Sequence, residues 1–440
     1  MIFRQGFLCL LAALLFRVPA EAQTPRKEAV LLRAARLLDV RTGQILPDRA
    51  ILVVGDRIAE VGEAAKVAAA AGKDVRVIEL PGATLLPGLI DCHAHLLGNL
   101  KDLSAARDLR TSSAQGALWG VHNVQIWLDH GFTALRDAGE ADLDYGQLAL
   151  RDSIRKGLLR GPRMVSAGNF VSVTGGHGDA DVLAPDQGLA PRPNLADDVD
   201  GIASAVRRDL KYGADWIKLM ATGGVSDPWS DFNVQELSEE QMARAVELAH
   251  RAGRRVMAHA EGTQGIKAAV RAGVDSIEHG TMLDEEGAAL MSQRGTWLVP
   301  TLSTFQHAER DAERGADPVS LEKVRAILKH QQPAFERALR YHLKIAYGLD
   351  DDPDFLPQEF RALVRGGMKP TEALAAATIH AAELLGLSDQ IGTLEPGKYA
   401  DIIAVQDDPS KDIGAMEKVI FVMKGGELIK NLAVGRAAAN

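Results

Sequence analysis

Short apolar runs separated by turn residues lie near both ends of the chain. Near the N-terminus these runs cover residues 29–32, 51–54 and 75–78. Similar runs near the C-terminus cover residues 401–405, 419–422 and 427–429. Such runs, bounded by turns that contain glycine, are typical of β-strands. The pattern therefore predicts one small β-sandwich domain to which both ends of the chain contribute.

The centre of the chain alternates between strand patterns and helix patterns. Strand-like apolar segments occur at residues 215–220, 255–259, 276–279, 297–302 and 344–347. Ser238 and Gln241 have the spacing of a capping box, which predicts a helix that begins there and stops at Gly253. A second helix is predicted at residues 264–272. Repeated βα units of this kind predict a (β/α)8 TIM barrel of the α/β class.

The length of 440 residues exceeds one ordinary domain of about 100–200 residues and fits a barrel with a second unit. We predict four segments along the chain. They are a signal peptide at 1–22, the N-terminal part of the β-sandwich domain at 23–86, the barrel at 87–388 and the C-terminal part of the β-sandwich domain at 389–440.

The composition and charge of the chain limit the kinds of molecule that it is expected to bind. Hydrophobic residues make up 46% of the chain and charged residues 25%, as in a folded globular protein. The 59 acidic residues outnumber the 50 lysines and arginines, which gives a net charge of −9. This balance provides no basic field to attract a nucleic-acid backbone or an anionic membrane surface. We therefore expect no nucleic-acid partner.

The first residues have the features of a secretory signal. Arg4 precedes an apolar run at residues 6–16, and Ala20-Glu-Ala22 supplies an A-x-A cleavage site. A buried N-terminal helix is the alternative. Cleavage after Ala22 removes Cys9 and leaves Cys92, and a single thiol forms no internal disulfide. We expect an exported protein, periplasmic or secreted, with no membrane attachment after cleavage.

Histidines occur where barrel strands are predicted to end. His93 and His95 are two residues apart, so in an extended segment they point to one face, whereas Cys92 points to the other. His259 and His279 end two further predicted strands, and Asp350 follows the last one. Strand ends meet at one rim of a barrel. Imidazoles converging there suit zinc or a similar divalent ion.

Lys218 is an unexpected cation at this rim. It lies between Ile217 and Leu219 in a predicted buried strand. Burial lowers the pKa of a lysine and favours its neutral amine, which can take up carbon dioxide to become a carbamate. Such an anion could bridge two metal ions.

Together these stretches resemble the amidohydrolase superfamily, in the branch of imidazolonepropionase-like, Xaa-Pro dipeptidase-like and ochratoxin-hydrolysing enzymes. The resemblance covers nearly the whole chain after residue 22. The stretches that carry it are residues 86–96, 131–137, 174–178, 215–218, 222–224, 258–260, 277–280 and 392–401.

The resemblance implies a ligand set for two metal ions, most commonly zinc. His93, His95 and Asp350 would bind one ion, and N-carboxylated Lys218 would bridge it to a second ion held by His259 and His279. The family usually has Gly-Thr-Asp-Ala-Gly after the last strand, whereas this chain has Gly-Leu-Asp-Asp-Asp at residues 348–352. Asp351 therefore stays an alternative to Asp350.

The expected chemistry is hydrolysis without a covalent intermediate. Two metal ions lower the pKa of a shared water and polarise a carbonyl group. Asp350 and Lys218 are the predicted catalytic residues, with Asp350 acting as general base and then as general acid. His177, in a glycine-rich stretch, is predicted to orient the substrate or polarise its carbonyl group; its alternative role is to organise the loop.

The leading hypothesis is hydrolysis of the amide bond in N-acyl or aminoacyl amino acids, as in a carboxypeptidase or dipeptidase, with ochratoxin A among the possible substrates. Asp351 and Asp352 could then favour a basic substrate side chain; a solvated acidic loop is the alternative. Alternatives are hydrolysis of a cyclic amide, lactone or phosphotriester at the same site and, more remotely, an exported metal-binding protein without catalysis. The resemblance also implies a homo-oligomer, with an octamer as one candidate.

Overall fold

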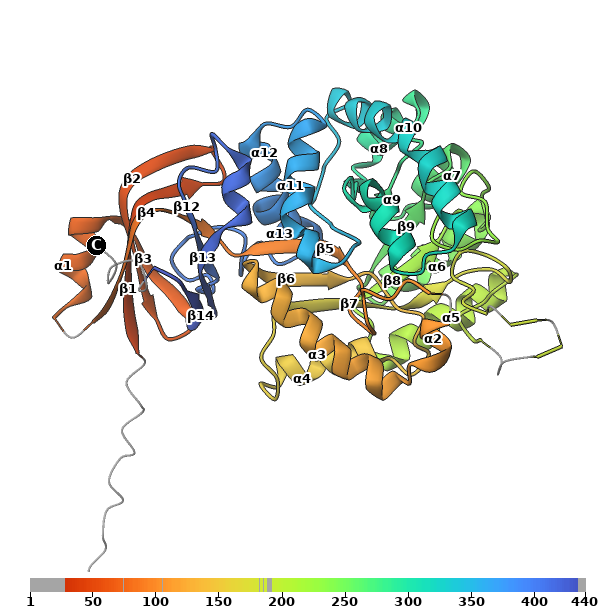
Figure 1. Cartoon of the computed structure of the whole chain (residues 1–440), viewed down its shortest axis with the longest axis horizontal. Helices are drawn as coiled ribbons and strands as arrows, with labels where there is room; N and C mark the ends of the chain where they lie inside the picture. Colours follow the sequence, from red (N-terminus) through yellow and green to blue (C-terminus); the bar gives the residue numbers. More distant parts are fainter. Residues whose placement is uncertain are drawn as a thin grey trace, which may run out of the picture.

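The computed structural model describes residues 28–73, 75–104, 106–181, 183–184, 186–187 and 192–433. The predicted signal peptide lies outside these residues and stays a prediction. The described strands form two separate seven-stranded sheets, one at each side of the view in Figure 1. Within the described ranges, no helix combines the length and apolar character needed to cross a membrane.

The first sheet contains strands from both ends of the chain, as predicted. Its strands are β1 (Ala29–Asp39), β2 (Gln44–Val54), β3 (Arg57–Glu63), β4 (Arg76–Pro87), β12 (Ile402–Gln406), β13 (Val419–Lys424) and β14 (Glu427–Asn431). Their order is β14-β13-β12-β4-β1-β2-β3, and the antiparallel pairing of β4 with β12 joins the two ends. Whereas the sequence predicted a β-sandwich, hydrogen bonds join all seven strands into one sheet, against which helix α1 (Ala64–Ala71) packs.

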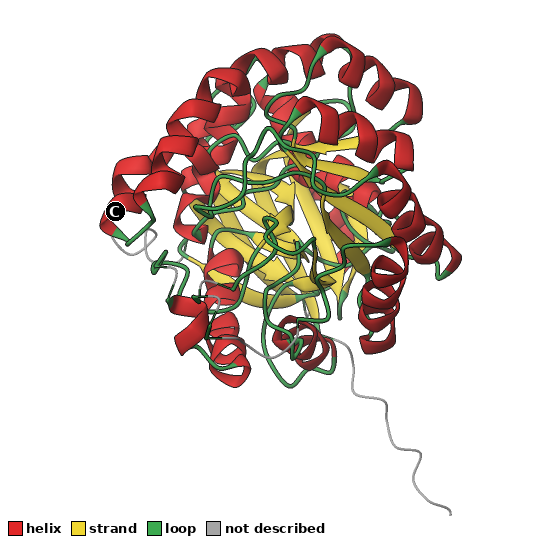
Figure 2. Cartoon of the chain, turned by 90° about the vertical axis from the view of Figure 1, so that its right-hand side faces the viewer, coloured by secondary structure: helices red, strands yellow, loops and turns green. Residues whose placement is uncertain are grey.

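The second sheet is parallel and follows chain order from β5 to β11. Its strands are β5 (Leu89–Ala94), β6 (Phe132–Asp137), β7 (Arg163–Val171), β8 (Trp216–Met220), β9 (Arg255–Ala260), β10 (Ser276–His279) and β11 (Trp297–Val299). Figure 2 shows these strands surrounded by helices. All residues of β5, β6 and β8 are buried, as expected where helices cover the outside of a parallel sheet.

The helices lie mostly in the connections between these strands. They are α2 (Arg107–Arg110), α3 (Ser113–Asp129), α4 (Gly146–Arg155), α5 (Val199–Tyr212), α6 (Glu239–Arg251), α7 (Thr263–Ala272), α8 (Glu285–Arg294), α9 (Ala308–Glu313), α10 (Pro318–Arg340), α11 (Leu356–Arg365), α12 (Pro370–Ala375) and α13 (Ala381–Leu385). The predicted capping box of α6 is confirmed, because the Ser238 hydroxyl accepts from the Gln241 backbone while the Gln241 side chain accepts from the Ser238 backbone.

The ring of parallel strands is nearly closed. The predicted strand at residues 344–347 is only a single bridge, between Leu298 and Ile345. Its backbone still bonds both neighbours: Leu298 N donates to Lys344 O at 2.8 Å, and Cys92 N donates to Tyr347 O at 2.9 Å. β11 is shorter than predicted because Pro300 has no backbone N–H to continue the ladder. Among the described residues, this ring therefore has seven regular strands.

The two sheets meet at Gly88, the residue between β4 and β5. A Cβ atom there would lie 2.1 Å from the Thr133 hydroxyl oxygen, so only glycine fits. Beside it, Arg163 bonds the Asp401 carboxylate at 2.9 and 3.1 Å. This junction sets the start of β5, and thereby the position of the histidines at its far end.

Candidate metal centre

The predicted site residues lie around one cavity of about 650 Å³. The residues that line it include His93, His95, His177, Lys218, His259, His279 and Asp350. They come from the carboxyl ends of β5, β8, β9 and β10, from the loop after β7, and from the segment after the Ile345 bridge. This rim is where catalytic groups of parallel barrels are found.

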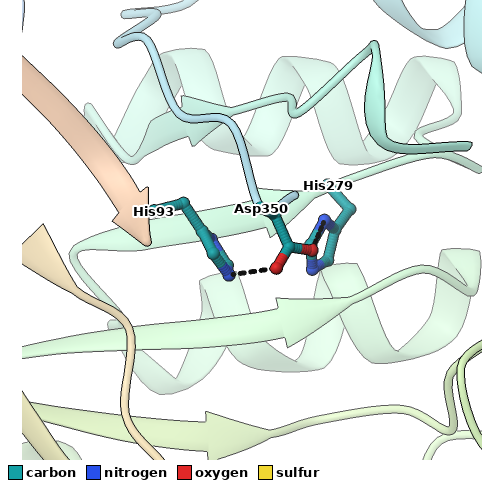
Figure 3. Close-up of side chains that lie close together, drawn as sticks. All are labelled: His93, His279 and Asp350. Carbon is teal, nitrogen blue, oxygen red and sulfur yellow. Dashed lines mark ion pairs between the residues drawn. The ribbon is translucent and has the colours of Figure 1, made fainter. Parts of the chain in front are cut away.

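His93, His279 and Asp350 form the tightest group. One potential ligand atom from each lies within 4.8 Å of the others. Figure 3 shows Asp350 between the two imidazoles, with its Oδ1 atom 3.6 Å from His93 Nε2 and its Oδ2 atom 3.9 Å from His279 Nδ1. His95 joins the group, because its Nε2 atom is 3.3 Å from Asp350 Oδ1.

Each of the first two histidines is held by its other nitrogen. His93 Nδ1 lies 2.8 Å from Glu278 Oε2, and His95 Nδ1 lies 2.8 Å from the Gly139 carbonyl oxygen. These partners place the ring proton on Nδ1 and leave Nε2 as a free lone pair. His93 Nε2 is buried and has no hydrogen-bond partner among the described residues. A buried, unpartnered nitrogen beside a carboxylate fits a metal ligand.

Burial favours the neutral form of His93, His259 and His279, which metal binding requires. Burial, together with the charge of Lys218, holds the pKa of His93 well below its usual range. Burial also lowers the pKa of His259 and brings the pKa of His279 to about 3. Asp350 behaves in the opposite sense: burial would raise its pKa, but the hydrogen bond and charge of His95 keep it below the usual value. The site thus combines three imidazoles that favour the neutral form with an ionised carboxylate. At His95, burial would lower the pKa, but the hydrogen bond and charge of Asp350 raise it above its usual value.

His259 and Lys218 occupy the other side of the group. The ring centres of His259 and His279 are 4.8 Å apart, and His259 Nε2 lies 3.1 Å from the Gly223 carbonyl oxygen. Lys218 is only 2% exposed, and burial lowers its pKa to about 8. Its side-chain nitrogen makes no hydrogen bond or ion pair with the part of the chain that the structure describes. The neutral amine expected from the sequence is therefore readily reached.

The structure distinguishes the three consecutive aspartates. Asp350 faces the histidines, whereas Asp351 accepts from Arg310 at 3.0 and 3.1 Å. Asp352 is paired with Arg314 at 2.9 Å. The expectation that Asp351 and Asp352 attract a basic substrate side chain is therefore wrong, because both carboxylates already bind arginines.

Backbone strain also marks the site. Asp350 and His279 have φ values of 57° and 69°, in the left-handed region that most side chains avoid. Strain of this kind persists where the surrounding structure enforces it, and it clusters at functional sites.

Two buried charged residues below the histidines were missed by the sequence analysis. The Glu278 carboxylate that holds His93 accepts from Arg136 Nη2 at 2.9 and 2.8 Å, and both side chains are fully buried. Arg136 Nε also donates to the Cys92 carbonyl oxygen at 2.6 Å. Their signal was present as charged residues beside apolar ones in β6 and β10. Cys92 itself is buried in an apolar cluster.

His177 lies beside His259, with ring centres 4.3 Å apart, and its Nδ1 atom is 2.6 Å from Asp227 Oδ2. The structure therefore brings it to the edge of the histidine group. Asp227 was also missed, since an aspartate in a polar loop has no distinctive pattern.

Comparison with known proteins agrees with this site. Residues 84–429 match the model of the amidohydrolase family. The chain is 34% identical over 375 residues to ochratoxinase from Aspergillus niger, covering 80% of this chain and 76% of that one. It is 28% identical over 427 residues to imidazolonepropionase from Pseudomonas fluorescens, covering 88% and 93%.

Comparison with solved structures also finds similar proteins. A Xaa-Pro dipeptidase with methionine bound in its active site superposes with a TM-score of 0.84 at 31% identity, covering 91% of this chain and 99% of that one. The family match covers more than half of the chain, and the fold, cavity and histidine group agree with it. The chain therefore belongs to the amidohydrolase family and is a hydrolase that acts on amide bonds.

Proposed function

We propose that this hydrolase binds two divalent metal ions, most commonly zinc, and cleaves the amide bond of N-acyl or aminoacyl amino acids. The observation that carries the proposal is the convergence of His93, His279 and Asp350, with an unpartnered buried nitrogen, in one cavity of about 650 Å³. Imidazole nitrogens with a carboxylate are a donor set that suits zinc.

The ligands divide into two sets. His93, His95 and Asp350 would hold one ion, and His259 and His279 the other. Lys218 would bridge the two ions as a carbamate, formed when its neutral amine attacks carbon dioxide and loses one proton. When bound, the ions supply an activated water and polarise the scissile carbonyl group.

Side chains of the protein transfer the proton and orient the substrate. The Asp350 carboxylate accepts the proton of the attacking water at Oδ1 or Oδ2 and returns it to the leaving nitrogen. His177 lies at the His259 edge of the cavity, where its ring can orient the substrate's acyl group. No side chain becomes acylated in this scheme.

The cavity supports a bulky, partly apolar substrate. Its volume lies within the about 300–1,000 Å³ of pockets that bind drug-sized ligands. Apolar side chains on its walls include Leu97, Leu103, Phe170, Trp229, Phe305 and Leu321. The relatives named ochratoxinase and Xaa-Pro dipeptidase support an amino acid on the leaving side and make ochratoxin A a reasonable test substrate.

Two further proposals rest on the sequence alone. Residues 1–22 direct export to the periplasm or the medium, and the mature chain forms a homo-oligomer without nucleic acid or membrane as partner. N-terminal sequencing of protein recovered from cells tests the first, since cleavage after Ala22 predicts Gln23 as the new first residue.

The experiment for the enzyme is a substrate panel. Zinc-loaded protein is assayed with N-acyl amino acids, dipeptides and ochratoxin A, and in parallel with a lactone, a cyclic amide and a phosphotriester. We expect hydrolysis of at least one linear amide, lost with a zinc chelator and restored by zinc. Turnover confined to the lactone, cyclic amide or phosphotriester would replace this proposal with the alternative chemistry, and turnover of none would reject both.

A further inference from the structure

The His177 ring is held by three neighbours. Its Nδ1 atom lies 2.6 Å from Asp227 Oδ2, and its ring centre lies 4.3 Å from that of His259, with the two ring planes tilted by 36°. Gly224 also lies against the ring, because a Cβ atom there would come within 2.2–2.4 Å of three ring atoms. The His177 backbone N–H donates to the Glu236 carboxylate at 3.0 Å. These contacts leave the ring little freedom to rotate.

Asp227 is anchored independently of the ring that it holds. Its Oδ1 atom accepts from the backbone N–H groups of Trp229 at 3.0 Å and Ser230 at 2.6 Å. Its Oδ2 atom accepts from the Ser230 hydroxyl at 2.6 Å, on the side that meets His177. Lys323 of α10 ties the same loop down by donating to the carbonyl oxygens of Gly224 and Ser230, both at 2.8 Å.

The two carboxylate oxygens of Asp227 therefore make different contacts. Oδ1 organises the loop backbone, and Oδ2 faces the imidazole. Burial would raise the pKa of Asp227, but the hydrogen bond to His177 and the bonds from Ser230 lower it to about 2, so the carboxylate is ionised. An ionised oxygen on Nδ1 requires a proton on that nitrogen.

We infer that Asp227 is a positioning residue for amide hydrolysis: it fixes the orientation of His177 and its Nδ1–H tautomer, which leaves Nε2 as the ring nitrogen that meets the substrate. His177 lines the cavity, and its side chain keeps 12% exposure. Its Nε2 atom has no hydrogen-bond partner within the described ranges. The inference rests on the proposed function, since it needs a substrate group at this edge of the cavity.

The test is a double-mutant cycle with Asp227→Asn, His177→Asn and both together, in zinc-loaded protein. Asparagine keeps an oxygen for the Trp229 and Ser230 backbone groups but turns an N–H donor toward Nδ1. We expect Asp227→Asn to lower kcat by at least about 10²-fold, with KM changed less, because a misplaced group costs about this much. In the His177→Asn background we expect it to lower kcat less than about threefold.

Equal losses in both backgrounds would overturn the inference, because Asp227 would then act only on the loop. Should Asp227→Asn fold poorly, Asp227→Glu takes its place in the same cycle, with the same criterion. Metal content is measured for every variant, since a purely local role leaves it unchanged.

A second measurement does not depend on turnover. The ¹⁵N shifts of His177, assigned through the His177→Asn spectrum, report which ring nitrogen carries the proton. We expect protonated Nδ1 in the parent protein and a changed tautomer in Asp227→Asn; the same tautomer in both would overturn the inference. If the parent protein hydrolyses no amide, the proposed function is wrong. If the parent is active but Asp227→Asn lowers kcat equally with and without His177, only the role inferred for Asp227 is wrong.

Discussion

Replacing Asp350 with asparagine is expected to lower kcat for amide hydrolysis by at least about 10³-fold. The carboxylate lies 3.6 Å from His93 and 3.3 Å from His95, and an amide in its place cannot accept the proton of the attacking water. The backbone should survive the change, because asparagine tolerates the left-handed conformation that φ of 57° requires. The loss should therefore be chemical rather than structural, and circular dichroism with steady-state kinetics separates the two.

The neighbouring Asp351→Asn variant is the matched control. Asp351 has the same chemical change, but it bonds Arg310 instead of the histidines. We expect its kcat to stay within about tenfold of the parent, with some loss of stability because a paired, largely buried charge is removed. If Asp351→Asn were the more damaging change, or Asp350→Asn lost less than about tenfold, the role assigned to Asp350 would be wrong.

Replacing Glu278 with glutamine is expected to weaken metal binding by about 10- to 100-fold. Glutamine preserves the shape but removes the charge that holds the Nδ1 proton of His93, so Nε2 is no longer reliably a lone pair. The change also leaves the Arg136 guanidinium buried without its counter-charge, which costs about 3–5 kcal/mol of unfolding free energy. Competition with a chelator measures the first effect, and denaturant unfolding of the metal-free protein measures the second.

An exposed glutamate with arginine partners provides the comparison. Glu285 bonds Arg337 at 2.8 Å and Arg340 at 2.6 Å on the surface. Because exposed pairs contribute about 0–1 kcal/mol, Glu285→Gln should change stability little and leave metal affinity unchanged. Equal behaviour of the two variants would mean that Glu278 does not orient His93.

Much of this arrangement follows from local sequence patterns. The apolar runs located β1, β2, β4 and β12 to β14 in the first sheet and β8 to β11 in the second, but they did not identify β3, β6 or β7. The Ser238 capping box located the start of α6 within one residue. The site histidines were found because parallel strands end at one rim, so spacing along the chain becomes proximity in space. Only the tertiary structure shows which of the adjacent aspartates faces the histidines. The Asp350 side chain faces His93 and His95, whereas the Asp351 side chain faces Arg310.

The supporting residues show where local patterns stop being informative. Arg136 and Glu278 meet across 142 residues of sequence, and Asp227 reaches His177 across 50. In the sequence, each member of these pairs has the pattern of an ordinary charged residue, because only the folded chain brings the members of a pair into contact. The segment at residues 344–347 was apolar enough to predict a strand, yet it forms only a single bridge, between Leu298 and Ile345.

Titration of metal-free protein with zinc, followed simultaneously by amide hydrolysis and by bound zinc per chain, tests the central claim most directly. The account predicts no turnover without metal, two zinc ions bound per chain at saturation, and full activity only after the second equivalent. Amide hydrolysis by protein that contains no metal would contradict the account, as would full activity with one ion per chain.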